Sequence, residues 1–240
     1  MNCAPGICSP WPDALRERSQ RLAYLGPAGT WTHQACRQWT GTAGLQPGPE
    51  LLPMAAEKAL QALAQRTIDA VCLPVSTRLV GATPYLAPVL ALLERQWRDP
   101  AAALQVVGEC RLELGYSLMA RPGVELAQLQ GVLAHPVALQ EAAPWLQRHL
   151  PAVLQQPCAS AGAAAQAVAG ARDRALACLG PALAATLHGL EVLQSGIEQG
   201  PHNETRWWLL ARADPSVIAA DAQQPWLGRF GLAHGPAASA

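Results

Sequence analysis

Residues 200–210 read Gly-Pro-His-Asn-Glu-Thr-Arg-Trp-Trp-Leu-Leu, a polar segment that leads directly into an aromatic and aliphatic one. Alternation along an extended chain places Thr205 on the same face as Trp207, Leu209 and Ala211. The stretch therefore predicts a buried strand with a hydroxyl at its entrance, beside an arginine. Such a hydroxyl can donate to an oxygen-rich ligand. On this segment alone, a strand start whose side chains satisfy turn hydrogen bonds is the more frequent arrangement.

The composition is that of a globular protein with one large domain or two small ones. Of the 240 residues, 50% are hydrophobic and 14% are charged, which allows a sizeable core without disulfides. The 17 basic and 17 acidic residues cancel and form no block of one sign. This balance argues against a nucleic-acid partner or an acidic membrane surface. No apolar run reaches the length of a membrane span, and residues 1–20 indicate a loose lead-in without a signal-peptide core.

Seven cysteines are present, without a Cys-x-x-Cys pair. Cys72 and Cys178 lie in apolar, strand-like runs, where cysteine commonly acts as a small buried hydrophobe. We therefore expect free thiols, a reducing compartment and a cytoplasmic location. The six histidines lack metal-ligand spacing, so we expect neither a metal nor another cofactor.

Strand and helix patterns alternate along the chain, which is typical of an α/β protein with mostly parallel sheets and covering helices. Extended segments are predicted at 21–25, 70–75, 104–119, 132–134, 152–156 and 175–179. Helices are predicted from about residue 30, at 56–63, at 85–97, at 139–150, at 160–172 and from 181.

Five segments, in order, resemble one family. Asn203 to Trp207 resembles the Asn-x-Thr-Arg-Phe signature of prephenate dehydratases, with Trp207 in place of the Phe. The other four segments resemble the family's Tyr-Leu-Gly-Pro loop, the strand into its Pro-Ile-Glu-Asn-Ser motif, its Ser-His-Pro-Gln motif and its Ser-Thr-Ala-Gly-Ala-Ala helix start. They are Tyr24–His33, Asp69–Val75, Ala134–Pro136 and Ala159–Ala164. The resemblance covers about residues 21–212.

The resemblance implies two α/β lobes of the periplasmic-binding-protein-like (type II) fold, with the ligand in an interlobe cleft. We expect lobe 1 to comprise residues 21–103 plus 196–213 and lobe 2 to comprise 104–195, with crossovers near 103–107 and 193–197. The strands after Leu104 would then belong to a different sheet from the Thr205 strand. The remaining 214–240 segment is shorter than the regulatory ACT domain of many family members, so we expect no phenylalanine feedback through such a domain.

The resemblance also implies a carbon–oxygen lyase of phenylalanine biosynthesis that acts on a small molecule. Prephenate loses water and carbon dioxide together and becomes phenylpyruvate. By this resemblance Thr205 is the catalytic donor to the departing hydroxyl. Asn203 and Arg206 are expected substrate contacts, although a structural ion pair explains Arg206 at least as well. The sequence leaves the oligomeric state open, a homo-oligomer included.

Two loops are candidates for holding the carboxylates of the substrate. Pro27, Gly29 and Thr30 belong to a turn that opens a helix, and Ser160 and Gly162 belong to a second one. Backbone N–H groups at helix N-termini bind anions, and glycine lets a ligand approach closely. For each loop taken alone, the alternative to carboxylate binding is ordinary capping of the helix that follows.

Several polar family positions differ in this chain. Ser76 and Thr77 stand where the family has Glu and Asn, and Val137 stands at the Gln of Ser-His-Pro-Gln. Ser76 and Thr77 are still expected to contact the substrate, and His135 either faces the ligand or is satisfied by nearby backbone. Two other functions therefore stay open: a non-aromatising prephenate decarboxylase, and a catalytically silent small-molecule binder. The retained Thr205 argues against the decarboxylase.

Overall fold

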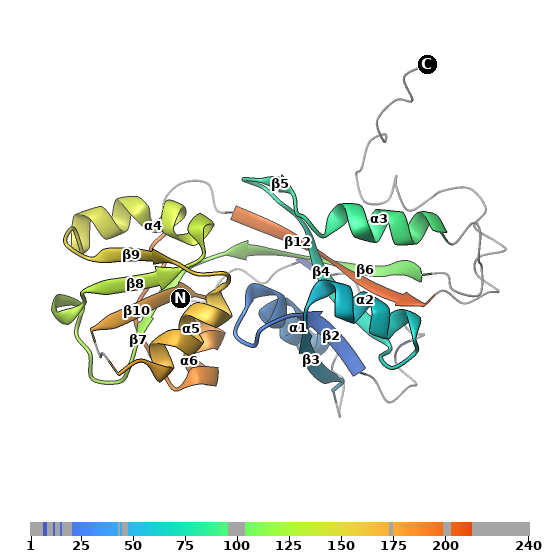
Figure 1. Ribbon diagram of the computed structural model, residues 1–240, viewed down its shortest axis with the longest axis horizontal. Helices are drawn as coiled ribbons and strands as arrows, with labels where there is room; N and C mark the ends of the chain where they lie inside the picture. Colours follow the sequence, from blue (N-terminus) through green and yellow to red (C-terminus); the bar gives the residue numbers. More distant parts are fainter. Residues whose placement is uncertain are drawn as a thin grey trace, which may run out of the picture.

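The computed structural model describes residues 7–8, 12, 15, 21–42, 44, 48–95, 104–172, 175–198 and 203–212. Two sheets lie end to end, each flanked by helices (Figure 1). The helices are α1 (Trp31–Thr42), α2 (Ala56–Ala64), α3 (Leu86–Arg95), α4 (Pro136–His149), α5 (Ala161–Gly170) and α6 (Ala182–His188). The strands are β1 (Ile7–Cys8), β2 (Arg21–Leu25), β3 (Glu50–Met54), β4 (Ala70–Thr77), β5 (Gly81–Ala82), β6 (Leu104–Leu114), β7 (Ser117–Ala120), β8 (Gly131–Ala134), β9 (Leu154–Pro157), β10 (Leu176–Gly180), β11 (Glu191–Ser195) and β12 (Asn203–Arg212).

Each lobe contains one sheet. The strand order is β1-β6-β12-β4-β2-β3 in lobe 1, with β5 added to β4, and β11-β7-β10-β8-β9 in lobe 2. The pairs β2/β3, β2/β4, β8/β9 and β8/β10 are parallel, and the other pairs are antiparallel. The expected two-lobe α/β architecture is confirmed, but the sheets are mixed and not mostly parallel. The reason is that the strands next to the crossings between the lobes, β6, β7, β11 and β12, pair antiparallel with their neighbours.

The first crossing between the lobes lies later than expected. Strand β6 pairs with β12 along its whole length, from Leu114 opposite Asn203 to Leu104 opposite Arg212. The prediction that strands after Leu104 leave the Thr205 sheet is therefore wrong for β6, and lobe 2 begins after Leu114. A chain that leaves a lobe and later returns to it can pair its outgoing and incoming strands antiparallel.

The two crossings run side by side. The carbonyl of Tyr116 accepts hydrogen bonds from the N–H groups of Gly196, at 3.0 Å, and Ile197, at 3.4 Å. The Glu198 carboxylate accepts from the N–H of Tyr116 at 2.7 Å. Residues 199–202 lie outside the described part of the chain, as do 213–240 and most of residues 1–20.

Alternation along β12 distributes its side chains between two cores. Trp207, Leu209 and Ala211 pack on the side of α1, whereas Trp208 and Leu210 pack against α2 and α3. All five side chains are at most 3% exposed. The predicted shared face of Thr205, Trp207, Leu209 and Ala211 is therefore confirmed by the packing.

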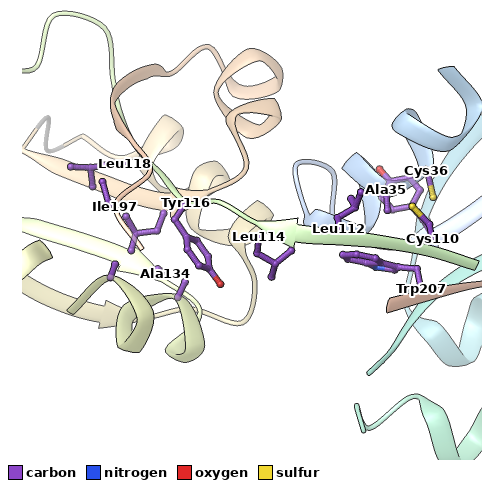
Figure 2. Close-up of a cluster of buried hydrophobic side chains, with 14 of the residues drawn as sticks. Ala35, Cys36, Cys110, Leu112, Leu114, Tyr116, Leu118, Ala134, Ile197 and Trp207 are labelled. Carbon is purple, nitrogen blue, oxygen red and sulfur yellow. The ribbon is translucent and has the colours of Figure 1, made fainter. Parts of the chain in front are cut away.

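One core cluster extends through the junction between the lobes. It follows alternate residues of the outgoing chain, Leu112, Leu114, Tyr116 and Leu118, from the sheet of lobe 1 to the sheet of lobe 2 (Figure 2). The cluster continues on the inner side of α4. Burial of these side chains removes apolar surface from water on both sides of the crossing and so couples the lobes.

The turn between β2 and α1 is held by local hydrogen bonds. Gly29 has a φ of 81°, which favours glycine. Its N–H donates to Nδ1 of His33 at 3.2 Å, and the Thr30 hydroxyl accepts from the His33 N–H at 3.3 Å. The imidazole of His33 stacks on Tyr24 with 4.7 Å between ring centroids. Burial, and secondarily Arg37, lower the pKa of His33, so folding favours its neutral form.

The same turn contacts lobe 2 directly. A β-carbon added at Gly162, at the start of α5, would overlap the carbonyl oxygen of Ala28 and lie 3.0 Å from Cγ of Pro27. A β-carbon added at Gly29 would lie 3.2 Å from Cβ of Ala184 in α6. The lobes therefore approach as closely as they do because glycine occupies both positions.

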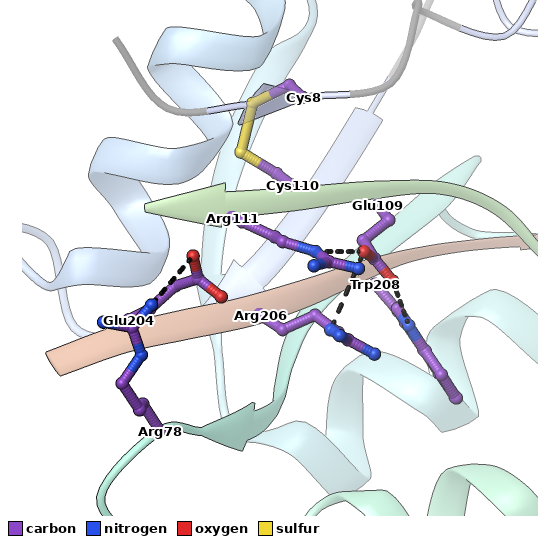
Figure 3. Close-up of polar contacts among 8 residues, drawn as sticks. All are labelled: Cys8, Arg78, Glu109, Cys110, Arg111, Glu204, Arg206 and Trp208. Atoms are coloured by element: carbon purple, nitrogen blue, oxygen red, sulfur yellow. Dashed lines mark hydrogen bonds and ion pairs between the residues drawn. A yellow bond between two sulfur atoms is a disulfide. The ribbon is translucent and has the colours of Figure 1, made fainter. Parts of the chain in front are cut away.

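One pair of cysteines differs from the expectation of free thiols. Cys8 and Cys110 form a disulfide that joins β1 to β6 (Figure 3). Cys36, Cys72 and Cys178 are free and fully buried, as expected of small apolar side chains. Within the described segments, no helix is long and apolar enough to cross a membrane.

We predict that Gly162→Ala lowers the free energy of unfolding by about 1–3 kcal/mol, because the added methyl overlaps backbone of the other lobe. Gly170→Ala is the matched control in the same helix, since nothing lies within 4 Å of a β-carbon there. Helix propensity favours Ala over Gly by at most about 1 kcal/mol, so this control should be neutral or slightly stabilising. Urea denaturation measures both. Equal effects at the two positions would contradict the tight contact between the lobes.

We also predict that His33 makes the protein less stable in mild acid. The unfolded state takes up a proton as the pH falls through 6.5, whereas the folded state resists it because its pKa is lower. Stability attributed to His33 is therefore present above pH 6.5 and declines below it. The difference in unfolding free energy between wild type and His33→Gln should shrink from pH 7 to pH 5. A difference that is constant over this range would show that His33 protonates equally well in both states.

Candidate active site

A cavity of about 470 Å³ lies where the two lobes meet. Lobe 1 contributes the start of α1, the ends of β4 and β12, and the loop of residues 80–85. Lobe 2 contributes the starts of α4 and α5, and the junction contributes Leu114 and Tyr116. Of the residues predicted to form the site, those that line the cavity are Thr30, Thr77, His135, Ser160, Asn203 and Thr205.

Thr205 is 4% exposed and lies at the cavity wall. It pairs with Thr77 of β4 on one side and with Leu112 of β6 on the other. Among the described residues, no hydrogen bond occupies its hydroxyl. The hydroxyl is therefore available to a molecule in the cavity.

Two neighbouring hydroxyls of β4 lie opposite β12, next to a bulge, and only one of them reaches the cavity. Thr77 pairs with Thr205 and Ser76 with Arg206, but Trp207 pairs with Pro74, so Val75 is an extra residue. Pro74 and Thr77 both line the cavity, while Ser76 does not. The prediction that Ser76 lines the site is wrong, because consecutive residues of a strand point to opposite faces.

Arg206 lies on the face of the sheet opposite to Thr205. Its Nε is 3.6 Å from Oε1 of Glu109, which also accepts from Nε of Arg111 at 2.6 Å. The indole of Trp208 donates to the other oxygen of Glu109 at 3.3 Å (Figure 3). Arg206 is not among the residues of the described cavity wall, and it forms the structural ion pair that was the alternative interpretation.

Two helix N-termini open onto the cavity from opposite lobes. The hydroxyl of Thr30 caps α1, and that of Ser160 caps α5 by accepting from the Ala163 N–H at 3.1 Å. The N–H groups of the first two residues of each helix have no acceptor among the described residues, as is usual for helix starts. Trp31, Thr32 and Ala161 carry three of these groups and line the cavity. Such helix starts attract anions.

Three predicted contacts lie beside the cavity and not in its wall. Pro27 and Gly162 touch each other across the lobes, and Gly29 faces Ala184 and His188 of α6. Their role as substrate contacts stays a prediction, and the structure shows them where the two lobes approach each other most closely. The glycines at 29 and 162 do mark places of close approach, as expected, but the group that approaches each of them belongs to the other lobe of the protein.

His135 forms the N-cap of α4, where its Nδ1 accepts from the Val137 N–H at 3.3 Å. Burial lowers the pKa of His135, which favours a neutral imidazole. His135 is therefore satisfied by nearby backbone, and because it also lines the cavity, contact with a ligand stays a prediction.

A buried polar cluster at the junction was not predicted from the sequence. Asn203 is 1% exposed and its Nδ2 donates to Oε1 of Glu141, in α4, at 2.9 Å. The phenol of Tyr116, 3% exposed, lies near Glu141 and Asn203. Burial, together with Glu141 and Glu198, raises the pKa of Tyr116, so its hydroxyl stays protonated. Residues so far apart in sequence carry no common pattern that would reveal this cluster.

The described wall of the cavity contains no Asp, Glu, Lys or Arg. It offers hydroxyls, one amide, backbone N–H groups and the rings of Trp31, Tyr85, Tyr116 and Trp207. In the described segments no group of three or more His, Cys, Asp and Glu could hold a metal ion. The site is therefore suited to a small cyclic anion held by neutral donors.

The chain is similar to known proteins in sequence and in fold. Residues 22–215 match the family model of prephenate dehydratase. A prephenate dehydratase of Mycolicibacterium vanbaalenii is 35% identical over 81% of this chain, which spans 62% of that relative's length. The structure of an Arthrobacter aurescens prephenate dehydratase in complex with L-Phe is 27% identical, with a TM-score of 0.67 over 81% of this chain and 60% of that one.

A further solved structure, of a protein described as a novel type of quorum quenching acylase, is 25% identical with the same TM-score of 0.67. The matched region covers 81% of this chain and 65% of the chain in that structure. The family model spans both lobes and the whole described cavity wall. The chain belongs to the prephenate dehydratase family.

Proposed function

We propose that this chain is a prephenate dehydratase, which converts prephenate to phenylpyruvate with loss of water and carbon dioxide. The observation that carries the proposal is the unoccupied hydroxyl of Thr205, in a cavity that two helix N-termini enter from opposite lobes. The family membership and the relatives named prephenate dehydratase support it.

The geometry supports a division of tasks within the cavity. The N–H groups of Trp31 and Thr32 in α1 and of Ala161 in α5 are donors suited to the two carboxylates of prephenate. Thr205 is suited to donate to the ring hydroxyl as it departs. A positioned donor of this kind typically contributes about 10²–10³ in rate. The apolar remainder of the wall excludes water from the ring carboxylate, which favours its loss as carbon dioxide.

Two other functions make different predictions for the product. A non-aromatising decarboxylase is favoured by the absence of the family's Glu, Asn and Gln at Ser76, Thr77 and Val137. It would keep the ring hydroxyl and yield a dihydro-hydroxyphenylpyruvate. A silent binder would yield nothing above the spontaneous background. Thr205 at the cavity wall favours the dehydratase over both, since only that reaction needs a donor to the hydroxyl.

Our proposal includes a small-molecule substrate, no nucleic-acid or membrane partner, and a cytoplasmic location. The location rests on the biosynthetic role of the relatives and on the three buried free thiols. A homo-oligomer is compatible with the proposal.

We predict that Thr205→Val abolishes phenylpyruvate formation above background, because it removes the hydroxyl with little change in shape. Folding should be affected by no more than about 1–2 kcal/mol. Thr205→Ser, which keeps the hydroxyl, should retain activity. Thr186→Val, at an exposed threonine of α6, is the matched control and should behave as the wild type. The measurement is the product formed from prephenate, identified by NMR. Turnover by Thr205→Val at the wild-type rate would make Thr205 structural and exclude the mechanism.

A further inference from the structure

A side-chain hydrogen bond joins the start of α1 to β12 at the cavity wall. The indole Nε1–H of Trp207 donates to the hydroxyl oxygen of Thr32 at 3.0 Å. Both residues line the cavity, and Trp207 is 1% exposed and Thr32 4% exposed. The family signature that the sequence resembles has Phe at position 207, and a phenyl ring has no N–H to donate. The bond therefore depends on the tryptophan of this chain.

This bond leaves the proton of the Thr32 hydroxyl available. A threonine hydroxyl has one proton to donate and two lone pairs that accept. The indole occupies one lone pair, and among the described residues no acceptor takes the proton. Because the proton must point away from the indole hydrogen, the rotation of the hydroxyl is restricted. An accepted hydrogen bond also polarises a hydroxyl and strengthens it as a donor.

The Thr32 hydroxyl stands beside the backbone donors of a helix start. Thr32 is the second residue of α1, and its N–H and that of Trp31 are suited to a substrate carboxylate. The hydroxyl adds a third donor, in a described wall that contains neither Lys nor Arg. Helix N-termini favour anions, and a hydrogen bond to an ionised group is stronger than one between neutral groups.

Trp207 connects this group of donors to the strand of Thr205. Alternation places Thr205 and Trp207 on the same face of β12, and both line the cavity. The indole is packed in the same core cluster as Leu112 (Figure 2). A packed ring is suited to hold a hydroxyl in one orientation, because ordering before the ligand arrives lowers the cost of binding.

We propose that Thr32 is a substrate-binding residue whose hydroxyl donates to the pyruvyl carboxylate, and that Trp207 is the positioning residue that orients it. The inference rests on the proposed function for the identity of the substrate. Strong donors at the ring carboxylate would oppose its loss as carbon dioxide, so this group of donors suits the carboxylate that keeps its charge. A contact that is equal in the ground state and the transition state changes KM and leaves kcat unchanged.

Three single substitutions test the proposal. Thr32→Val removes the hydroxyl with little change in shape, and KM for prephenate and Kd for phenylpyruvate should both rise about 10–100-fold, as for a lost hydrogen bond to a charged group. Its kcat should stay within about twofold of the wild type, because the contact is uniform. Thr32→Ser keeps the hydroxyl and should retain most of the binding. Trp207→Phe leaves the hydroxyl without its partner, and both constants should rise about 3–10-fold. Calorimetry with phenylpyruvate measures Kd, and product formation measures KM and kcat.

A double variant separates positioning by Trp207 from a change in the shape of the wall. Because Trp207 acts through Thr32, Thr32→Val combined with Trp207→Phe should bind no more weakly than Thr32→Val alone. Trp208→Phe is the matched control at the next residue of β12. Its indole donates to Glu109, and it lies outside the described cavity wall, so Kd and KM should stay at the wild-type values. Urea denaturation checks the fold of each variant, and Trp207→Phe keeps the test available if Thr32→Val does not fold.

The outcomes distinguish the inference from the proposed function. A wild-type Kd in Thr32→Val, or a loss confined to kcat, overturns the role of Thr32. A wild-type Kd in Trp207→Phe, or an effect that multiplies onto Thr32→Val, overturns the role of Trp207. A wild type that does not bind phenylpyruvate overturns both.

The binding measurement also works without turnover. A wild type that binds phenylpyruvate but forms none from prephenate contradicts the proposed reaction, while the expected order of Kd among the variants would still support the carboxylate contact. An active wild type whose variants all bind normally overturns only the inference.

Discussion

Gly162 lies in the first turn of α5, at a point where any side chain would overlap the carbonyl of Ala28 in the other lobe. The rest of the site depends on this contact, because it sets how near the start of α5 comes to the start of α1. With the two helix starts held together, residues from both starts line one cavity that contains no charged side chain in its described wall. The anion site that we propose is thereby built from backbone N–H groups, at a modest cost in desolvation.

Much of the architecture could be predicted because it follows local rules. Alternation in the β12 sequence correctly separated Trp207 and Leu209 from Trp208 and Leu210. Turn residues ahead of Thr30 and Ser160 correctly located two capped helices. The five collinear motifs identified the family. These features depend on neighbours in the sequence, and so the sequence was sufficient to infer them.

The remaining features depend on contacts between distant segments. The lobe boundary was misplaced because the pairing of β6 with β12 joins residues about a hundred positions apart. Ser76 was assigned to the cavity because the bulge and the facing of β4 are set by its partner strand. Tyr116 and Glu141 were missed because only the folded chain brings them to Asn203.

The central claim is that the two helix starts bind the carboxylates of one ligand across the lobes. The most direct measurement is the change in amide ¹H–¹⁵N chemical shifts on titration with phenylpyruvate, the proposed product. We expect the amides of Trp31, Thr32 and Ala161 to shift together, with one shared Kd. Shifts confined to one lobe, or elsewhere on the surface, would contradict it.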